Sequence, residues 1–141
     1  MRELTPEPLT ATAFAPFGRV IEASDAAVKL DINQGHAIRY DRLAELVLKT
    51  FERHPLGSQT FMPLSARPYL VAVAPAGPFD PTAIRLFRAG GHQGVHYRKG
   101  VWHHFLLVLA ESDFLVVDRA GPGDNCEEVE VEQGAQIVVR P

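Results

Sequence analysis

Glycine and proline interrupt this chain too often for it to form long helices. The 141 residues include 11 Gly and 11 Pro, and these 22 residues exceed the roughly 17 that average usage of about 12% would give. The segments between them are short and rich in Val, Phe, Tyr and Leu, a pattern typical of short strands joined by tight turns. The sequence therefore predicts a mainly β fold, either a sandwich or a barrel, with one or two short peripheral helices.

Individual elements can be placed from the same pattern. Strands are predicted at residues 20–21, 48–53, 59–64, 69–75, 94–97, 103–110, 113–118, 127–132 and 136–139. A short helix is predicted over residues 10–17, where Thr10 can cap the first turn. A second helix is predicted over residues 80–90, because Asp80 and Pro81 are a helix-start signature and three apolar residues follow on one helical stripe.

Length and composition exclude several classes of protein. A chain of 141 residues suits one domain, 1–141. A formal charge of −3 argues against nucleic acid as the main partner, because phosphate binding needs a basic face. No apolar run approaches the length of about 20 residues that spans a membrane. Cys126 is the single cysteine and cannot form an intrachain disulfide, so a reducing, cytoplasmic setting is expected.

Two segments concentrate residues that can do chemistry. In residues 51–61, Glu52 and His54 share one face of a strand, and Gln59 would join them if the strands on either side of Pro55 and Gly57 are antiparallel neighbours. A solvated hairpin end is the alternative, and these residues alone favour it, because charged side chains are mostly exposed.

The second segment, residues 94–104, holds three of the six histidines together with Tyr97 and Lys99. His103 and His104 point to opposite faces of a strand, so only one of them can serve a given site. Each residue taken singly has a structural explanation, such as packing or a solvated turn. The density of polar and aromatic side chains in the ten positions 95–104 nevertheless favours a site.

Taken together, the two segments resemble the paired motifs of cupins, small β-barrels that hold a metal or a small ligand. Cupins place His-x-His and then Glu in the first motif, and Gly-x-x-His in the second. Here Glu52 replaces the first His, Gln59 replaces the acidic ligand, and Gly100 precedes His103 by three residues. Imidazole and carboxylate suit a divalent ion, whereas Gln is a weak ligand. A metal site of Glu52, His54, Gln59 and His103, holding Ni or Mn, is one interpretation.

A more specific resemblance lies in longer stretches of sequence. ERHPLGSQTFMPL (residues 52–64), GVHYRKGVWHH (94–104) and SDFLVVDRAGPGDNC (112–126) resemble ureidoglycolate lyase, formerly called ureidoglycolate hydrolase. NQGHAIRY (33–40) and FAPFG (14–18) fit the same family. The resemblance implies a cupin-like barrel, or double-stranded β-helix, and a homodimer. It also implies cleavage of ureidoglycolate to glyoxylate and urea in allantoin (purine) degradation.

The chain departs from that family at three places. The family usually has Asn at the position of His96 and Pro at the position of Phe105. It also carries an additional strand-containing stretch, with its own Arg, between the residues that correspond to Leu46 and Val47, which adjoin here. The third difference bears directly on how the substrate carboxylate would be bound.

The implied reaction needs a base for the substrate hydroxyl, an acid for the departing nitrogen and a cation for the carboxylate. We expect His54 and His103 to act on the hydroxyl and nitrogen, with Glu52 as their partner or as the base. The remaining substrate contacts are predicted for Lys99 or Arg39 at the carboxylate, Gln59 and Tyr97 at the ureido group, and His96 at the pocket edge. Sequence does not separate acid from base, because a neighbouring carboxylate raises a histidine pKa and burial lowers it.

Two other functions fit the same residues. A metal-dependent cupin oxygenase or isomerase would need tightly bound metal, and a non-catalytic ligand-binding cupin would bind without turnover. Residues 118–126 (DRAGPGDNC) are predicted to organise a turn or a dimer contact, and Cys126 to be a small packed side chain without a nucleophilic role.

Overall fold

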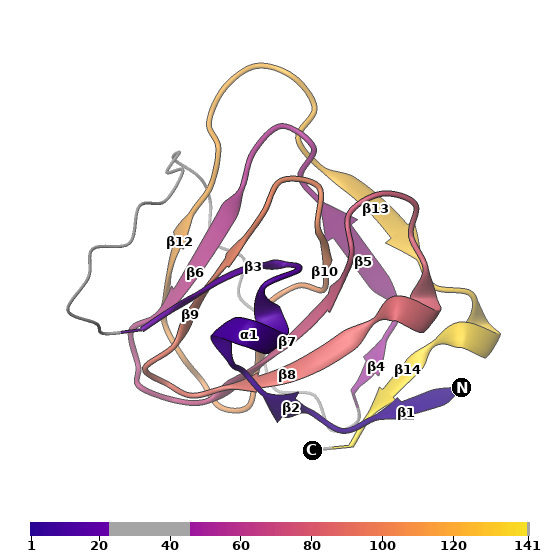
Figure 1. The fold of residues 1–141 in the computed structure, drawn as a ribbon, viewed down its shortest axis with the longest axis horizontal. Helices are drawn as coiled ribbons and strands as arrows, with labels where there is room; N and C mark the ends of the chain where they lie inside the picture. The colour runs from indigo at the N-terminus through magenta and orange to yellow at the C-terminus, as the bar shows by residue number, and fades with distance from the viewer. Residues whose placement is uncertain (23–45, 141) are drawn as a thin grey trace.

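The computed structural model describes residues 1–22 and 46–140, which form three β-sheets with a few short helical turns (Figure 1). The mainly β class predicted from the sequence is confirmed. The seven-stranded sheet contains β13 (Glu127–Glu130), β5 (Thr50–Arg53), β10 (Trp102–His103), β7 (Tyr69–Ala74), β8 (Arg85–Ala89) and β2 (Glu7–Pro8) in that order, with β11 (Leu107–Val108) also paired to β7. The four-stranded sheet has the order β12 (Phe114–Val117), β6 (Gln59–Pro63), β9 (Gly94–Tyr97) and β3 (Gly18–Ile21). The three-stranded sheet has the order β1 (Arg2–Leu4), β14 (Ile137–Val139) and β4 (Val47–Leu48).

Strand β7 lies between two apolar clusters and shows how the sheets are layered. All six of its residues are buried. Tyr69, Val71 and Val73 point into a cluster shared with the four-stranded sheet, and the alternate residues point into a cluster shared with the three-stranded sheet. The seven-stranded sheet is therefore the middle layer, and its continuous apolar strand reflects burial on both faces.

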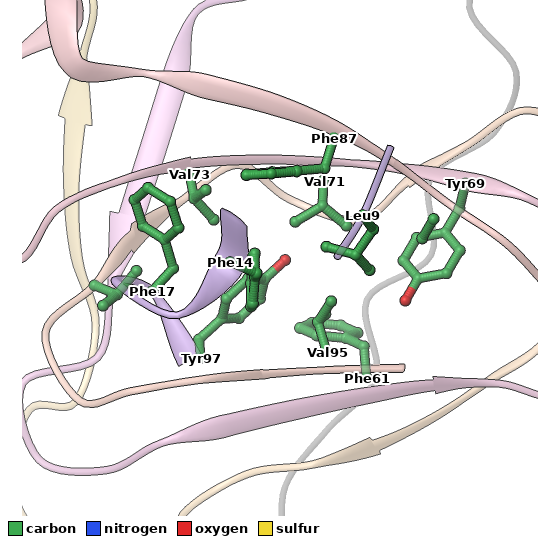
Figure 2. Packing of buried hydrophobic residues seen from close by; sticks show 12 residues of the cluster. Leu9, Phe14, Phe17, Phe61, Tyr69, Val71, Val73, Phe87, Val95 and Tyr97 are labelled. Atoms are coloured by element: carbon green, nitrogen blue, oxygen red, sulfur yellow. The ribbon is translucent and has the colours of Figure 1, made fainter. Parts of the chain in front are cut away.

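Helix α1 (Ala11–Phe14) closes the first of these clusters with aromatic side chains. Thr10 caps the helix as predicted, its hydroxyl accepting a hydrogen bond from the Ala13 backbone at 3.2 Å. Phe14 is fully buried, and its ring centroid lies 5.5 Å from that of Phe87 and 6.1 Å from that of Tyr97 (Figure 2). The helix thus anchors β9, which carries Tyr97 towards the candidate site.

The helix predicted over residues 80–90 is wrong beyond its first turn. Asp80 caps a single 3-10 turn (Pro81–Ala83), and the chain then continues as β8, paired with β7 and β2. Ile84 and Leu86 face one apolar cluster while Phe87 faces the other. Because both faces of this strand are buried, its apolar residues imitate the spacing of a helical stripe.

Two predicted strands are each divided: residues 48–53 contribute to β4 and β5, which lie in different sheets, and residues 103–110 to β10 and β11. The other predicted strands are found with shifts of a residue or two. A second 3-10 turn (Gln133–Ala135) precedes β14. Within residues 1–22 and 46–140, no helix is long and apolar enough to cross a membrane.

Candidate active site

Polar side chains from four strands meet at one end of the space between the seven-stranded and four-stranded sheets. Glu52 on β5 is the register partner of His103 on β10, and Gln59 on β6 is the register partner of Tyr97 on β9. β5 and β6 belong to different sheets, so the expected antiparallel pairing is wrong. The connection through Pro55 and Gly57 crosses from one sheet to the other and still brings the three first-segment residues together.

The centre of this cluster is a carboxylate between two imidazoles. Glu52 Oε1 lies 3.7 Å from His54 Nε2 and 3.9 Å from His103 Nδ1. The His103 ring stacks on Tyr97, with centroids 4.4 Å apart and planes 4° from parallel. Glu52 and His54 are 6% and 8% exposed and His103 is 1% exposed, so their interactions are only weakly screened by water.

The hydrogen bonds of His54 determine its protonation state. Its Nδ1 lies 2.7 Å from the Asn125 carbonyl oxygen, which can only accept, and its Nε2 lies 3.2 Å from Gln59 Oε1. That Gln59 atom is the oxygen because Gln59 Nε2 donates to the Asp118 carboxylate at 2.9 Å. Both ring nitrogens of His54 therefore face acceptors, and the ring satisfies both as an imidazolium.

The surroundings of His54 shift its pKa in the same direction. Burial by itself lowers the pKa of His54, but the Glu52 carboxylate 3.7 Å away, together with the Asn125 carbonyl and the charge of Asp118, outweighs burial and leaves that pKa raised. Burial likewise opposes ionisation of Glu52, yet the adjacent His54 and His103 hold the pKa of its carboxyl below the usual value. His54 and Glu52 thus form an ion pair.

His103 has the opposite character. Burial, the largest influence, lowers its pKa to about 4 despite the attraction of Glu52. Its Nδ1 faces two acceptors, Glu52 Oε1 and the His104 carbonyl oxygen at 3.3 Å, so Nδ1 carries the proton of the neutral ring. The other nitrogen, Nε2, is then a bare lone pair, and it is buried with no hydrogen-bond partner in the described part of the chain. An unpartnered buried acceptor of this kind is suited to receive a proton from a ligand.

Residues 118–126 contribute three further groups that sequence reasoning assigned to a turn or a dimer contact. Asp118 accepts from Gln59, the Asn125 backbone accepts from His54, and the Cys126 thiol donates to Glu52 Oε2 at 3.6 Å. Cys126 is exposed, so the prediction of a packed side chain is wrong. The only sequence signal for this role was the density of Asp, Asn and Gly in the segment, which a simple turn shows equally well.

Gly100 connects the two motifs. Its φ of +78° is a conformation that favours glycine, and its backbone N–H donates to the His54 carbonyl oxygen at 2.9 Å. The turn before β10, and hence His103, is therefore tied to the residue that follows β5. The Gly-x-x-His spacing has a structural cause in this contact.

Three predicted residues lie elsewhere. His96 is on the opposite face of β9 from Tyr97, where its Nδ1 lies 2.7 Å from the Thr60 hydroxyl, because successive strand residues alternate between faces. The structure therefore separates His96 from the cluster. Lys99 is exposed in the turn between β9 and β10. Arg39 falls outside the described residues.

The cluster also contains the donor set for a divalent cation. One ligand atom from each of Glu52, His54 and His103 lies within 4.8 Å of the others, and Gln59 Oε1 adjoins them. Two imidazoles, a carboxylate and an amide oxygen fit a borderline cation such as Ni or Mn in kind. Metal binding and the His54 imidazolium exclude each other, because the Nε2 lone pair serves either a proton or a metal.

The fold and site define a mainly β protein whose two facing sheets hold a buried carboxylate and two histidines in opposite protonation states. The family model described as "Ureidoglycolate lyase" matches residues 1–50 and 46–138. The chain is 44% identical to the ureidoglycolate lyase of Stutzerimonas stutzeri over 100% of this chain and 97% of that protein. It is 47% identical to that of Burkholderia mallei over 91% and 89% of the two chains. This chain belongs to the ureidoglycolate lyase family, a family of enzymes.

The comparisons also locate a deletion. The alignment to the Stutzerimonas protein spans 166 positions although this chain has 141 residues, so about 25 positions of the relative have no counterpart here. The two pieces of the family match meet at residues 46–50. That point coincides with the junction of Leu46 and Val47, where the sequence predicts a missing stretch, and it lies just before β4 and β5.

Proposed function

We propose that this protein cleaves ureidoglycolate to glyoxylate and urea, with His54 as general acid and His103 as general base. The observation that carries the assignment is the contrast between the two rings around Glu52. His54 donates from both nitrogens, whereas His103 keeps a buried, unpartnered Nε2. Family membership supports the choice of substrate.

Ureidoglycolate carries a hydroxyl and a ureido nitrogen on the same carbon. His103 Nε2 takes the hydroxyl proton, the carbon–oxygen bond becomes the aldehyde of glyoxylate, and the carbon–nitrogen bond breaks. His54 Nε2 delivers a proton to the departing nitrogen, which leaves as urea. His103 takes up one proton and His54 releases one, so the reaction is balanced without a co-reactant. Proton transfers of this kind typically contribute about 10²–10⁴-fold each.

Glu52 lies between the two histidines and serves both. Its negative charge stabilises the His54 imidazolium before the reaction and the His103 imidazolium that forms during it. Gln59 and Tyr97 orient the ureido group in this proposal, and Lys99 or Arg39 binds the carboxylate. We extend the proposal to a cupin-like, homodimeric enzyme of allantoin degradation in the cytoplasm, a setting supported by the single cysteine.

A metal-dependent reaction is the second candidate, favoured by the closeness of the ligand atoms of Glu52, His54 and His103. These residues, with Gln59, would hold the cation. When bound, the cation would supply Lewis-acid polarisation of the substrate oxygens. His54 would then lack its Nε2 proton, so this candidate removes the general acid of the first.

The test is an assay of glyoxylate and urea from ureidoglycolate, with and without chelator. The acid–base proposal predicts turnover that survives chelation, and turnover that chelation abolishes would favour the metal-dependent candidate. His103→Ala should lower kcat by at least tenfold. His92→Ala is the matched control, since His92 is exposed in the turn between β8 and β9. No glyoxylate above the uncatalysed rate from folded wild-type protein would refute the proposed function.

A further inference from the structure

Asp118 makes its side-chain hydrogen bond to the candidate site through Gln59, and its charge also raises the pKa of His54. It follows β12 directly, and one carboxylate oxygen, Oδ2, accepts from Gln59 Nε2 at 2.9 Å. The other oxygen, Oδ1, accepts from the Arg119 backbone at 2.7 Å. Asp118 is therefore held on one side by its own turn and reaches into the site on the other.

The two ends of the Gln59 amide differ chemically although they are nearly identical in shape. The NH₂ end only donates and the oxygen only accepts. Because a carboxylate cannot donate, Asp118 binds the NH₂ end and leaves Gln59 Oε1 facing His54 Nε2 at 3.2 Å. Gln59 is 6% exposed, so the reverse orientation would place two donors against each other at His54 and two acceptors against each other at Asp118, with little water available to compensate.

We propose that Asp118 is a positioning residue, which orients the Gln59 amide so that the site presents an acceptor oxygen beside His54. This inference rests on the proposed lyase function and adds a basis for substrate orientation to it. An acceptor oxygen suits the N–H donors of a ureido group and disfavours a carboxylate. The substrate is thereby oriented with its nitrogen towards His54, the acid.

A purely structural role for Asp118 makes a different prediction. In that case the bond to the Arg119 backbone is the important one, and an asparagine, whose Oδ1 also accepts, would preserve it. A change at Gln59 would then have no bearing on the effect of a change at Asp118. The two roles can be separated by exchanging the chemical groups between positions 59 and 118.

The experiment compares D118N, Q59E and the double variant D118N/Q59E by kcat/KM for ureidoglycolate. In D118N the Gln59 amide loses its fixed orientation, and in Q59E two carboxylates face each other. We expect each single variant to lose activity on the order of tenfold. In the double variant the amide introduced at position 118 donates to the carboxylate introduced at position 59, an oxygen again faces His54 and the net charge is restored. Activity should therefore return to within about threefold of wild type.

D113N is the matched control, because Asp113 is exposed just before β12 and undergoes the same change of charge. It should leave kcat/KM within about twofold of wild type. A double variant no more active than the poorer single variant, with wild type active, would overturn the inference and leave the proposed function intact.

An NMR measurement tests the inference without turnover. The side-chain amide resonances of Gln59, assigned by their loss in Q59E, should move in D118N and stay in place in D113N. Resonances that are unchanged in D118N would overturn the inference whatever the activity. Inactive wild-type protein with shifted Gln59 resonances would refute the lyase function while supporting the orienting role of Asp118.

Discussion

Acidification from pH 7.5 to pH 4.5 is expected to weaken this fold through His103. The ring is 1% exposed and its pKa is lowered from 6.5 to about 4 by burial. Below pH 6.5 the unfolded chain binds a proton at this histidine and the folded chain does not. The unfolded state is therefore increasingly favoured as the pH falls towards 4. The stabilising contribution is present above pH 6.5 and is lost across the window from 6.5 to about 4.

The loss of unfolding free energy can be calculated from the change in the His103 pKa on folding. A fall of the His103 pKa from 6.5 to about 4 corresponds to roughly 3 kcal/mol once the unfolded chain is fully protonated, and most of this is lost by pH 4.5. That loss is a large part of the 5–15 kcal/mol that stabilises a typical domain. The raised pKa of His54 acts in a different window, since its contribution is present below pH 6.5 and is lost as the pH rises. The lowered pKa of Glu52 acts below pH 4.5.

The assay is urea denaturation of wild type and His103→Gln at pH 7.5, 6.5, 5.5 and 4.5 in EDTA. Unfolding can be followed by circular dichroism and by the fluorescence of Trp102, the single tryptophan, which is 5% exposed. The lowered pKa of His104 contributes to both proteins and cancels in the comparison. Wild type should lose about 2–3 kcal/mol more than the variant over this range. Stability curves that run parallel would refute the assignment of His103 as a buried neutral base.

Two further predictions concern the surroundings of the cluster. Gly100→Ala forces a non-glycine residue to φ of +78°, so it should cost about 1–2 kcal/mol of unfolding free energy and lower kcat. The control Gly134→Ala, at an open surface position, should change neither quantity. A G100A variant with wild-type stability and activity would contradict the role of the turn. Burial and the nearby Glu52 charge raise the pKa of Cys126 to about 11, so alkylation at pH 8 should be at least tenfold slower than that of free cysteine, and rapid labelling would argue against the thiol contact with Glu52.

The local sequence pattern was sufficient to predict much of the β structure. The segments from residue 59 to 63 and from 94 to 97 have the composition and the flanking turns of strands, and both appear as β6 and β9. Thr10 capped α1 because a cap depends only on neighbouring residues. β8 was missed for the opposite reason, since its pattern has meaning only when both faces of the sheet are known to be covered.

The same distinction between local and long-range information separates the site residues that were predicted from those that were missed. Glu52, His54 and Gln59 were found because they lie within eight residues of one another, and His103 because a glycine marks its turn. Asp118, Asn125 and Cys126 were assigned to a turn, although each contacts one of those residues across more than fifty positions of sequence. Such contacts leave no periodic signal, because the partner lies at the end of a neighbouring strand that is distant in the sequence.

The sequence by itself determined the chemical inventory of the protein: a mainly β chain with two histidines, a carboxylate and an amide set between glycine and proline turns. Composition and short-range spacing are enough for that conclusion. Only the tertiary structure distinguished the surroundings of the two histidines, and this difference is the basis of the proposal that His54 is the acid and His103 the base. The difference arises from long-range partners, since Asn125 and Gln59 place acceptors at both nitrogens of His54, while burial against Tyr97 keeps His103 neutral.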